Sequence, residues 1–147
     1  SAVIVGFVFN AINGFLNGYA IRNLAPHLTD NGWFTTPCFI AGIMLMITGV
    51  TMNIHSDSVL RNLRKPGETG YKIPYGGMYR WVSVPNYFGE ITEWCGFALA
   101  AWTPAALSFA VFSFSNLFPR ALAHHRWYLK NFENYPGDRK AIIPGII

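Results

Sequence analysis

The sequence predicts an all-α fold, a polytopic bundle of transmembrane helices. Hydrophobic residues make up 52% of the 147-residue chain and charged residues only 12%, about half the charged fraction of an ordinary soluble domain. Residues 1–21, 31–54 and 94–119 contain no Asp, Glu, Lys or Arg. Uncharged runs of roughly 20 residues are long enough to cross the hydrocarbon core of a bilayer. Several such runs in one short chain indicate an integral membrane protein.

Residues 3–21 form the first expected span. In "GFLNG", Gly14 and Gly18 have the GxxxG spacing that lets another helix approach closely, although two glycines fall there equally well by chance. No basic n-region precedes the apolar run and no soluble domain follows it, so a cleaved signal peptide explains it poorly. The sequence begins with "SAVIV", without an initiator Met. We therefore expect earlier helices of the complete protein to be missing from this chain.

Residues 36–54 form the second expected span, after a short polar connection at 22–35. A polar loop follows at 57–81, and we expect its first part to continue the helix. The sequences "KPG", "ETG", "KIP" and "YGG" mark turns in the rest of this loop.

Residues 82–119 are too many for one span, and "WTP" interrupts them near Pro104. Cytoplasmic loops of membrane proteins are rich in Lys and Arg. The loop after the second span and the C-terminal tail each contain five basic residues: Arg61, Arg64, Lys65, Lys72 and Arg80 in the loop, and Arg120, Arg126, Lys130, Arg139 and Lys140 in the tail. If both segments are cytoplasmic, an even number of crossings separates them. Two helices hinged near Pro104 satisfy this condition, which makes four spans in all.

Other classes of site have little support. Cys38 and Cys95 lie far apart in apolar runs, where cysteine packs as a small hydrophobic residue. The basic residues behind the net charge of +4 flank apolar spans, so membrane orientation explains them better than nucleic-acid binding. The sequence contains no GxG turn, P-loop, HExxH, CxxC or GxSxG motif. We expect no metal ion and no nucleic-acid partner.

Three sets of polar residues recur at helical spacing, so each set shares one helix face. The sets are Asn53, Asp57, Arg61 and Arg64; Asn86, Glu90 and Glu93; and Arg120, His124 and Tyr128. Ionisable groups inside a span cost roughly 3 kcal/mol or more at the helix centre, and they usually face a bundle interior or a wet cavity. We expect the three sets to converge and to form a polar site at the cytoplasmic side. Their side chains suit phosphates, ribose hydroxyls and a planar ring.

Each set also has a simpler structural explanation that involves no ligand. Asp57 with Arg61 fits a surface ion pair, and Glu90 fits an ion pair with Arg64 or Arg120 that holds helices together. The remaining residues fit the edge of the bilayer: His124 and His125 as interfacial histidines, and Trp127 and Tyr128 as members of the aromatic belt.

Two long blocks carry a resemblance: "NIHSDSVLRNLRKPGETGYKIPYGGMYRWVSVPNYFGEITEWCGFALA" and "RALAHHRWYLKNFENYPGDRKAIIP". They resemble the C-terminal half of the steroid 5α-reductase (3-oxo-5α-steroid 4-dehydrogenase) family. The resemblance implies a seven-helix membrane enzyme that reduces the Δ4 double bond of 3-oxo steroids with NADPH. Residues 1–147 would then be the C-terminal part of a single transmembrane domain and contain its last four helices.

The resemblance also implies roles for individual residues. Residues expected to contact NADPH are Asn53, Asp57, Arg64, Lys72, Asn86, Glu90, Arg120, His124 and Tyr128. Glu90 and Tyr128 are the catalytic candidates in this chain. The family polarises the steroid 3-carbonyl with a Glu and a Tyr from earlier helices, which this chain does not include.

The chemistry of the residues agrees with that resemblance. Arg64 and Lys65 suit the pyrophosphate or the 2′-phosphate, because guanidinium groups bind phosphate through paired hydrogen bonds. Asp57 and Asn53 suit ribose hydroxyls, and Glu90 beside Asn86 suits the nicotinamide carboxamide. The Gly- and Pro-rich loop after the second span is expected to fold over the cofactor as a lid. Hydride attack on an enone would produce an enolate whose oxygen needs hydrogen-bond donors.

Alternative functions are a trans-2-enoyl-CoA reductase, or another sterol double-bond reductase, of the same fold. A methyltransferase of the isoprenylcysteine type would bind S-adenosylmethionine instead. From a different class, a proton-coupled transporter would use Glu90, Glu93 and His124 as a relay. As a reductase, the protein is expected in the endoplasmic reticulum membrane of a eukaryote or the inner membrane of a bacterium, with its cofactor site facing the cytoplasm.

Overall fold

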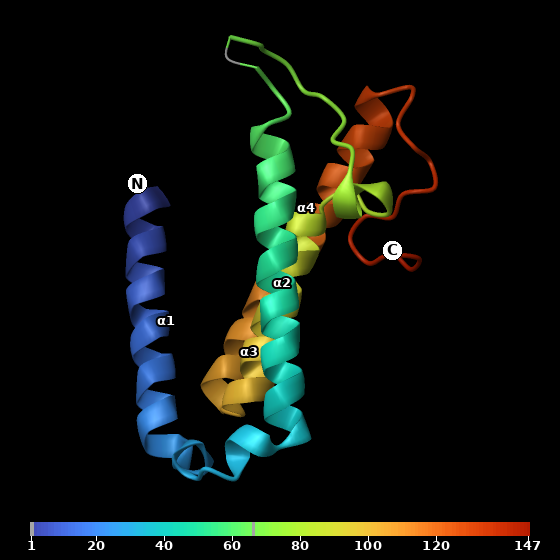
Figure 1. Cartoon of the computed structure of the whole chain (residues 1–147). Coiled ribbons are helices and arrows are strands. Elements are labelled where there is room, and N and C mark those ends of the chain that lie inside the picture. Colours follow the sequence, from blue (N-terminus) through green and yellow to red (C-terminus); the bar gives the residue numbers. More distant parts are fainter. Residues whose placement is uncertain (1, 66) are drawn as a thin grey trace.

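The protein is described by a computed structural model that covers residues 2–65 and 67–147. Over these ranges it contains four α-helices: α1 (Ala2–Leu24), α2 (Pro37–Arg61), α3 (Pro85–Ala101) and α4 (Pro104–Asn131) (Figure 1). Short 3-10 helices lie between them: η1 (Pro26–Thr29), η2 (Trp33–Thr35) and η3 (Gly77–Arg80). The predicted all-α class is confirmed. Helices α1, α2 and α4 are long and apolar enough to cross a membrane, and α3 has 17 residues, near the lower limit of a span.

Proline and threonine define where the later helices begin. Pro37, Pro85 and Pro104 each occupy the first position of a helix, where the missing N–H costs no hydrogen bond and φ is already helical. The side chain of Thr103 accepts a hydrogen bond from the Ala106 N–H at 3.2 Å, which caps α4. Helix α3 ends at Ala101, and the next residue, Trp102, has a left-handed φ of 48°. The predicted break near Pro104 is confirmed, and it separates two helices.

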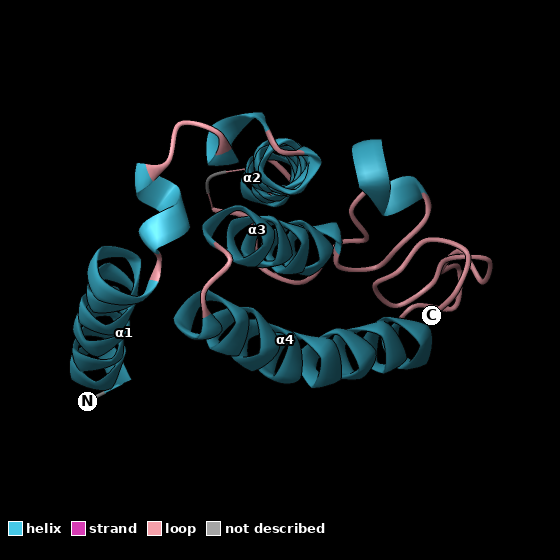
Figure 2. Cartoon of the chain, turned by 90° about the horizontal axis from the view of Figure 1, so that it is seen from below, coloured by secondary structure: helices cyan, strands magenta, loops and turns pink. Residues whose placement is uncertain are grey.

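Helix α3 lies between α2 and α4 (Figure 2), and glycines bring α2 and α3 into close contact. Gly42 and Gly49 on α2 face Gly96 and Gly89 on the antiparallel α3. A Cβ atom added at Gly89 would lie 2.7 Å from the Asn53 nitrogen and 2.8 Å from the Gly49 oxygen. No side chain fits at such distances, so the two backbones touch along this glycine seam.

Helix α1 stands apart from the other three and contacts mainly α4. The ring of Phe9 stacks on Phe112, with ring centroids 4.7 Å apart. Gly14 and Gly18 have no neighbouring atom within 4 Å of an added Cβ. The close helix approach predicted from the GxxxG spacing is therefore not found among the described residues.

The basic loop and the basic tail lie at the same end of the molecule (Figure 1). The end of α2, the loop at 62–84 and the tail at 132–147 gather there, while the α1–α2 connection and the α3–α4 break lie at the opposite end. The arrangement agrees with the charge argument, because α3 and α4 form an even pair of helices between the two basic segments.

Candidate functional site

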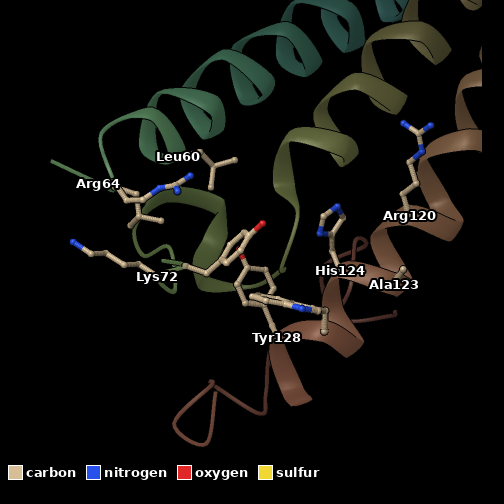
Figure 3. A pocket seen from close by; sticks show the side chains of 10 residues that line it. Leu60, Arg64, Lys72, Arg120, Ala123, His124 and Tyr128 are labelled. Atoms are coloured by element: carbon tan, nitrogen blue, oxygen red, sulfur yellow. The ribbon is translucent and has the colours of Figure 1, made fainter. Parts of the chain in front are cut away.

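A pocket of about 590 Å³ opens at the basic end of the molecule, within the usual size range of small-molecule and cofactor sites. The end of α2 and the following loop form one wall, and the last turns of α4 form the other (Figure 3). The lining residues are Leu60, Leu63, Arg64, Tyr71, Lys72, Arg120, Ala123, His124, Trp127 and Tyr128.

The lining carries positive charge. Arg64, Lys72 and Arg120 are basic, and none of the ten lining residues is acidic. Lys72 is already paired with Glu68, and this hydrogen bond lowers the pKa of the Glu68 carboxyl. Neither arginine has a carboxylate within ion-pair distance among the described residues. The two guanidinium groups, on opposite walls, therefore favour an anionic ligand.

Aromatic rings join the two walls. The Tyr71 ring, from the loop, meets the edge of Trp127 on α4 with centroids 4.8 Å apart. The Arg64 guanidinium lies 5.9 Å from the centroid of Tyr71, a cation–π distance. These contacts hold the loop against α4 and present flat apolar surface to a ring-containing ligand.

The polar set on α4 forms part of this wall. Arg120, His124 and Tyr128 share one face of the helix, as their spacing predicts, and all three line the pocket. His124 also approaches α3, where its Nε2 lies 3.5 Å from the Tyr87 hydroxyl.

A second polar cluster joins α2 to the start of α3. The Asn53 amide donates to the Asn86 carbonyl oxygen at 3.0 Å, and the Asn86 amide donates to Asp57 Oδ1 at 3.2 Å. Asp57 lies one helical turn before Leu60, which lines the pocket. The Asn86 Oδ1 atom is buried and has no hydrogen-bond partner among the described residues. A buried acceptor normally has a hydrogen-bond partner, so this atom is a position where one is missing.

Arg64 is not on the helix face predicted for it, and that prediction is wrong. Helix α2 ends at Arg61, and a proline at position 66 disfavours helical geometry just before it. Arg64 reaches the pocket from the loop instead, whereas Arg61 is exposed and does not line the pocket.

Glu90 and Glu93 lie on α3 as expected, and both are half-buried. Neither lines the pocket. The alternative ion pair of Glu90 with Arg64 or Arg120 is not found among the described residues. The pocket thus contains Arg64, Lys72, Arg120, His124 and Tyr128, while Asn53, Asp57 and Asn86 form the adjoining cluster.

The sequence did not predict that five of the lining residues belong to the site: Leu60, Leu63, Tyr71, Ala123 and Trp127. Ala123 and Trp127 follow Arg120 at i+3 and i+7, so the helical period could have placed them on the same face. Tyr71 lies in an irregular loop, where no periodic signal places a side chain.

The fold and the pocket define a helical protein with three helices long and apolar enough to cross a membrane, and with a basic, aromatic-lined pocket at one end of its bundle. Comparison with known proteins identifies the family. A family model described as 3-oxo-5-alpha-steroid 4-dehydrogenase matches residues 1–147. The chain therefore belongs to the 3-oxo-5-alpha-steroid 4-dehydrogenase family, as its resemblance predicted.

Individual relatives agree with the family match. The chain is 51% identical over 144 residues to 3-oxo-5-alpha-steroid 4-dehydrogenase 1 of Mus musculus, which covers 98% of this chain and 56% of the relative. It is 50% identical over 144 residues to 3-oxo-5-alpha-steroid 4-dehydrogenase 2 of Homo sapiens, with the same coverage of both. The chain spans about half the length of the curated relatives it matches.

Proposed function

We propose that the protein containing this chain is a membrane oxidoreductase that reduces the Δ4 double bond of 3-oxo steroids with NADPH. The relatives are named as 3-oxo-5-alpha-steroid 4-dehydrogenases. The observation that carries the proposal is the pocket between α2 and α4, where arginines and aromatic rings are combined in a volume of about 590 Å³.

The residues present fit NADPH. Arg64 and Arg120 supply guanidinium groups for phosphate oxygens, which such groups bind with paired hydrogen bonds. The rings of Tyr71 and Trp127 offer stacking surface for a base. Asp57 supplies a carboxylate for ribose hydroxyls, and the unpaired Oδ1 of Asn86 supplies an acceptor for an N–H or O–H group.

When bound, NADPH supplies the hydride that reduces the alkene. The role of this chain is to bind and orient the reactants and to exclude water, which strengthens the electrostatic interactions around the reacting atoms. Tyr128 and Glu90 are our catalytic candidates, since Tyr128 lines the pocket and Glu90 lies one turn beyond Asn86 on α3.

An apolar pocket between α1 and α4 supports the steroid part of the proposal. Its volume is about 380 Å³, and Phe9, Phe109 and Phe112 contribute aromatic walls. Both helices are long and apolar enough to cross a membrane. A rigid apolar molecule dissolved in lipid would reach such a pocket without passing through water.

We further propose that this chain is the C-terminal part of one transmembrane domain, because its relatives are about twice as long. The additional helices would supply the groups that polarise the 3-carbonyl. The basic end of the bundle would face the cytoplasm, from the endoplasmic reticulum membrane or, in a bacterium, the inner membrane.

The test is a product assay on membranes that contain the complete protein. NADPH is supplied with testosterone, progesterone or an enoyl-CoA, and the products are identified by mass spectrometry. We expect 5α-reduced steroid in the first two reactions, and no product when NADPH is omitted. Reduction of the enoyl-CoA alone would replace the steroid assignment, and ion flux without NADPH consumption would replace the reductase by a transporter.

A further inference from the structure

A buried hydrogen-bond network lies directly behind the pocket and is not part of its lining. Its centre is Ser83, which is 1% exposed and lies between η3 and α3. Ser83 Oγ is 2.6 Å from His125 Nδ1 on α4 and 2.6 Å from the hydroxyl of Tyr135 in the tail. It also donates to the Lys140 carbonyl oxygen at 3.2 Å. We call Ser83, His125 and Tyr135 the Ser83 network.

The Ser83 hydroxyl has three hydrogen-bond partners, as many as its hydrogen-bonding positions. A serine hydroxyl has one proton and two acceptor lone pairs. If Ser83 donates to the Lys140 carbonyl oxygen, its two lone pairs accept from His125 Nδ1 and from the Tyr135 hydroxyl, with His125 in the Nδ1–H tautomer. Removal of the Ser83 hydroxyl would leave the buried Tyr135 hydroxyl and the half-buried His125 ring without this partner, and an unpaired buried polar group costs more than the hydrogen bond itself.

The same place joins three distant segments through the backbone. The Ser83 N–H donates to the Lys140 carbonyl oxygen at 2.9 Å, and the Lys140 N–H donates to the Trp81 carbonyl oxygen at 2.9 Å. Val82 and Lys140 thereby form a parallel bridge. Loop, tail and α4 are therefore fixed relative to one another at this point.

The network contacts the pocket through two neighbours. The Tyr135 ring, which is 7% exposed, stacks on Tyr128 with centroids 5.1 Å apart and planes inclined by 12°. Tyr128 lines the pocket, and so does His124, which directly precedes His125. A shift of Tyr135 or His125 would thus move two side chains of the pocket wall.

We propose that Ser83, His125 and Tyr135 are positioning residues of the nucleotide pocket. They act through Tyr128 and His124 and touch no ligand themselves. The inference rests on the proposed function, because it assigns the effect of the network to NADPH binding. A purely structural network would change thermal stability and leave the affinity of the folded protein for NADPH unchanged.

The test compares variants of the complete protein in membranes. The measurements are the NADPH dissociation constant, KM for NADPH, kcat at saturating NADPH, and the thermal unfolding midpoint. Ser83→Ala and Tyr135→Leu are expected to weaken NADPH binding about tenfold, the effect of losing one well-placed buried interaction. Saturating kcat is expected to fall together with NADPH affinity and not in place of it, because the network also positions Tyr128, one of the catalytic candidates.

Conservative variants give the second readout. Tyr135→Phe keeps the ring stacked on Tyr128 and loses only the hydroxyl, so we expect about a threefold weakening of NADPH binding. His125→Asn retains a donor near the position of Nδ1 and is expected to bind NADPH better than His125→Leu. Thr51→Val is the control, since its exposed hydroxyl bonds only to the Ile47 carbonyl oxygen of its own helix.

The outcomes separate the two proposals. Unchanged NADPH affinity in Tyr135→Leu and Tyr135→Phe, or a fall in kcat with KM unchanged, would overturn the positioning role. These two variants also decide the matter if Ser83→Ala does not fold. Arg64→Ala is measured alongside: if it weakens NADPH binding while the network variants do not, only the positioning role fails. If the wild type itself does not bind NADPH, the proposed function fails.

Discussion

Two arginines three positions apart, Arg61 and Arg64, have different surroundings. Both side chains are exposed, and Arg61 is the last residue of α2. Arg64 follows in the loop, lines the pocket and lies over the ring of Tyr71. They form a matched pair in which the charge is the same and only the position differs.

We expect Arg64→Ala to raise the NADPH dissociation constant by roughly tenfold to a hundredfold. A hydrogen bond to a charged group contributes about 1.5–3 kcal/mol, and each 1.4 kcal/mol is about tenfold in affinity. Arg61→Ala is expected to change affinity less than about threefold, because Arg61 does not line the pocket and its charge reaches a ligand there only through screening solvent. Titration of each variant with NADPH measures the difference, and equal effects in both would show that the pocket does not discriminate between these charges.

At the residue scale, helical period placed the polar set of α4 correctly, whereas Glu90 and Glu93 of the α3 set share their helix as predicted but do not line the pocket. Arg120, His124 and Tyr128 share a face because α4 continues without a break through all three. The same reasoning failed at Arg64, since helix α2 ends first. The helical period predicts the direction of a side chain only for residues inside the helix. Where the helix ends depends on the residues that form the following turn.

At the scale of elements, the glycine seam between α2 and α3 determines how the polar residues of the two helices meet. Gly42 and Gly49 are two turns apart on α2, and Gly89 and Gly96 have the same separation on α3. Because the backbones touch there, Asn53 reaches the Asn86 carbonyl oxygen directly. The cluster thus depends on Gly49 and Gly89, which lie about one helical turn from Asn53 and Asn86.

Gly42→Ala and Gly89→Ala are expected to destabilise the protein by about 1–3 kcal/mol, the usual cost of overpacking. An added Cβ at Gly42 would lie 2.6 Å from the Ala100 nitrogen, and a backbone atom cannot rotate aside. Gly14→Ala is the matched control, because its Cβ would meet nothing within 4 Å and alanine favours helix. Thermal unfolding in detergent measures all three, and equal midpoints would contradict the seam.

The elements also differ in how far sequence could predict them. Uncharged runs and the proline at 104 predicted the four helices and the break between the last two. The path of the tail was not predicted, because the contacts of Tyr135 and Lys140 join residues more than fifty positions apart without a repeating pattern. Such pairings depend on the folded shape of the whole chain.

At the scale of the whole molecule, charge is separated between the two ends. The basic loop and tail share one end with the pocket, and the connection between α1 and α2 lies at the other. A membrane around α1, α2 and α4 would place these ends on opposite sides. From the distribution of Lys and Arg, we expect the pocket to face the cytoplasm.

Cysteine labelling tests this orientation. With Cys38 and Cys95 replaced by alanine, single cysteines are introduced at three exposed positions, Thr69, Glu133 and Asn31. In sealed vesicles with the cytoplasmic face outward, an impermeant maleimide is expected to label Thr69→Cys and Glu133→Cys. Asn31→Cys is expected to react only after permeabilisation. Labelling of Thr69→Cys and Asn31→Cys from the same side would exclude the proposed crossing of α2.

The fold of the tail has a practical consequence for anyone purifying or imaging this protein. The Ile142 and Ile143 N–H groups donate to the Ile147 carbonyl oxygen at 2.8 and 2.7 Å, and Ile142 is packed against Val84 and Ala121. An affinity tag or fluorescent protein inserted beside Ile147 would pull on a closed loop that is anchored through Ile142 to α4. Tags inserted into the connection between α1 and α2 would leave that region undisturbed.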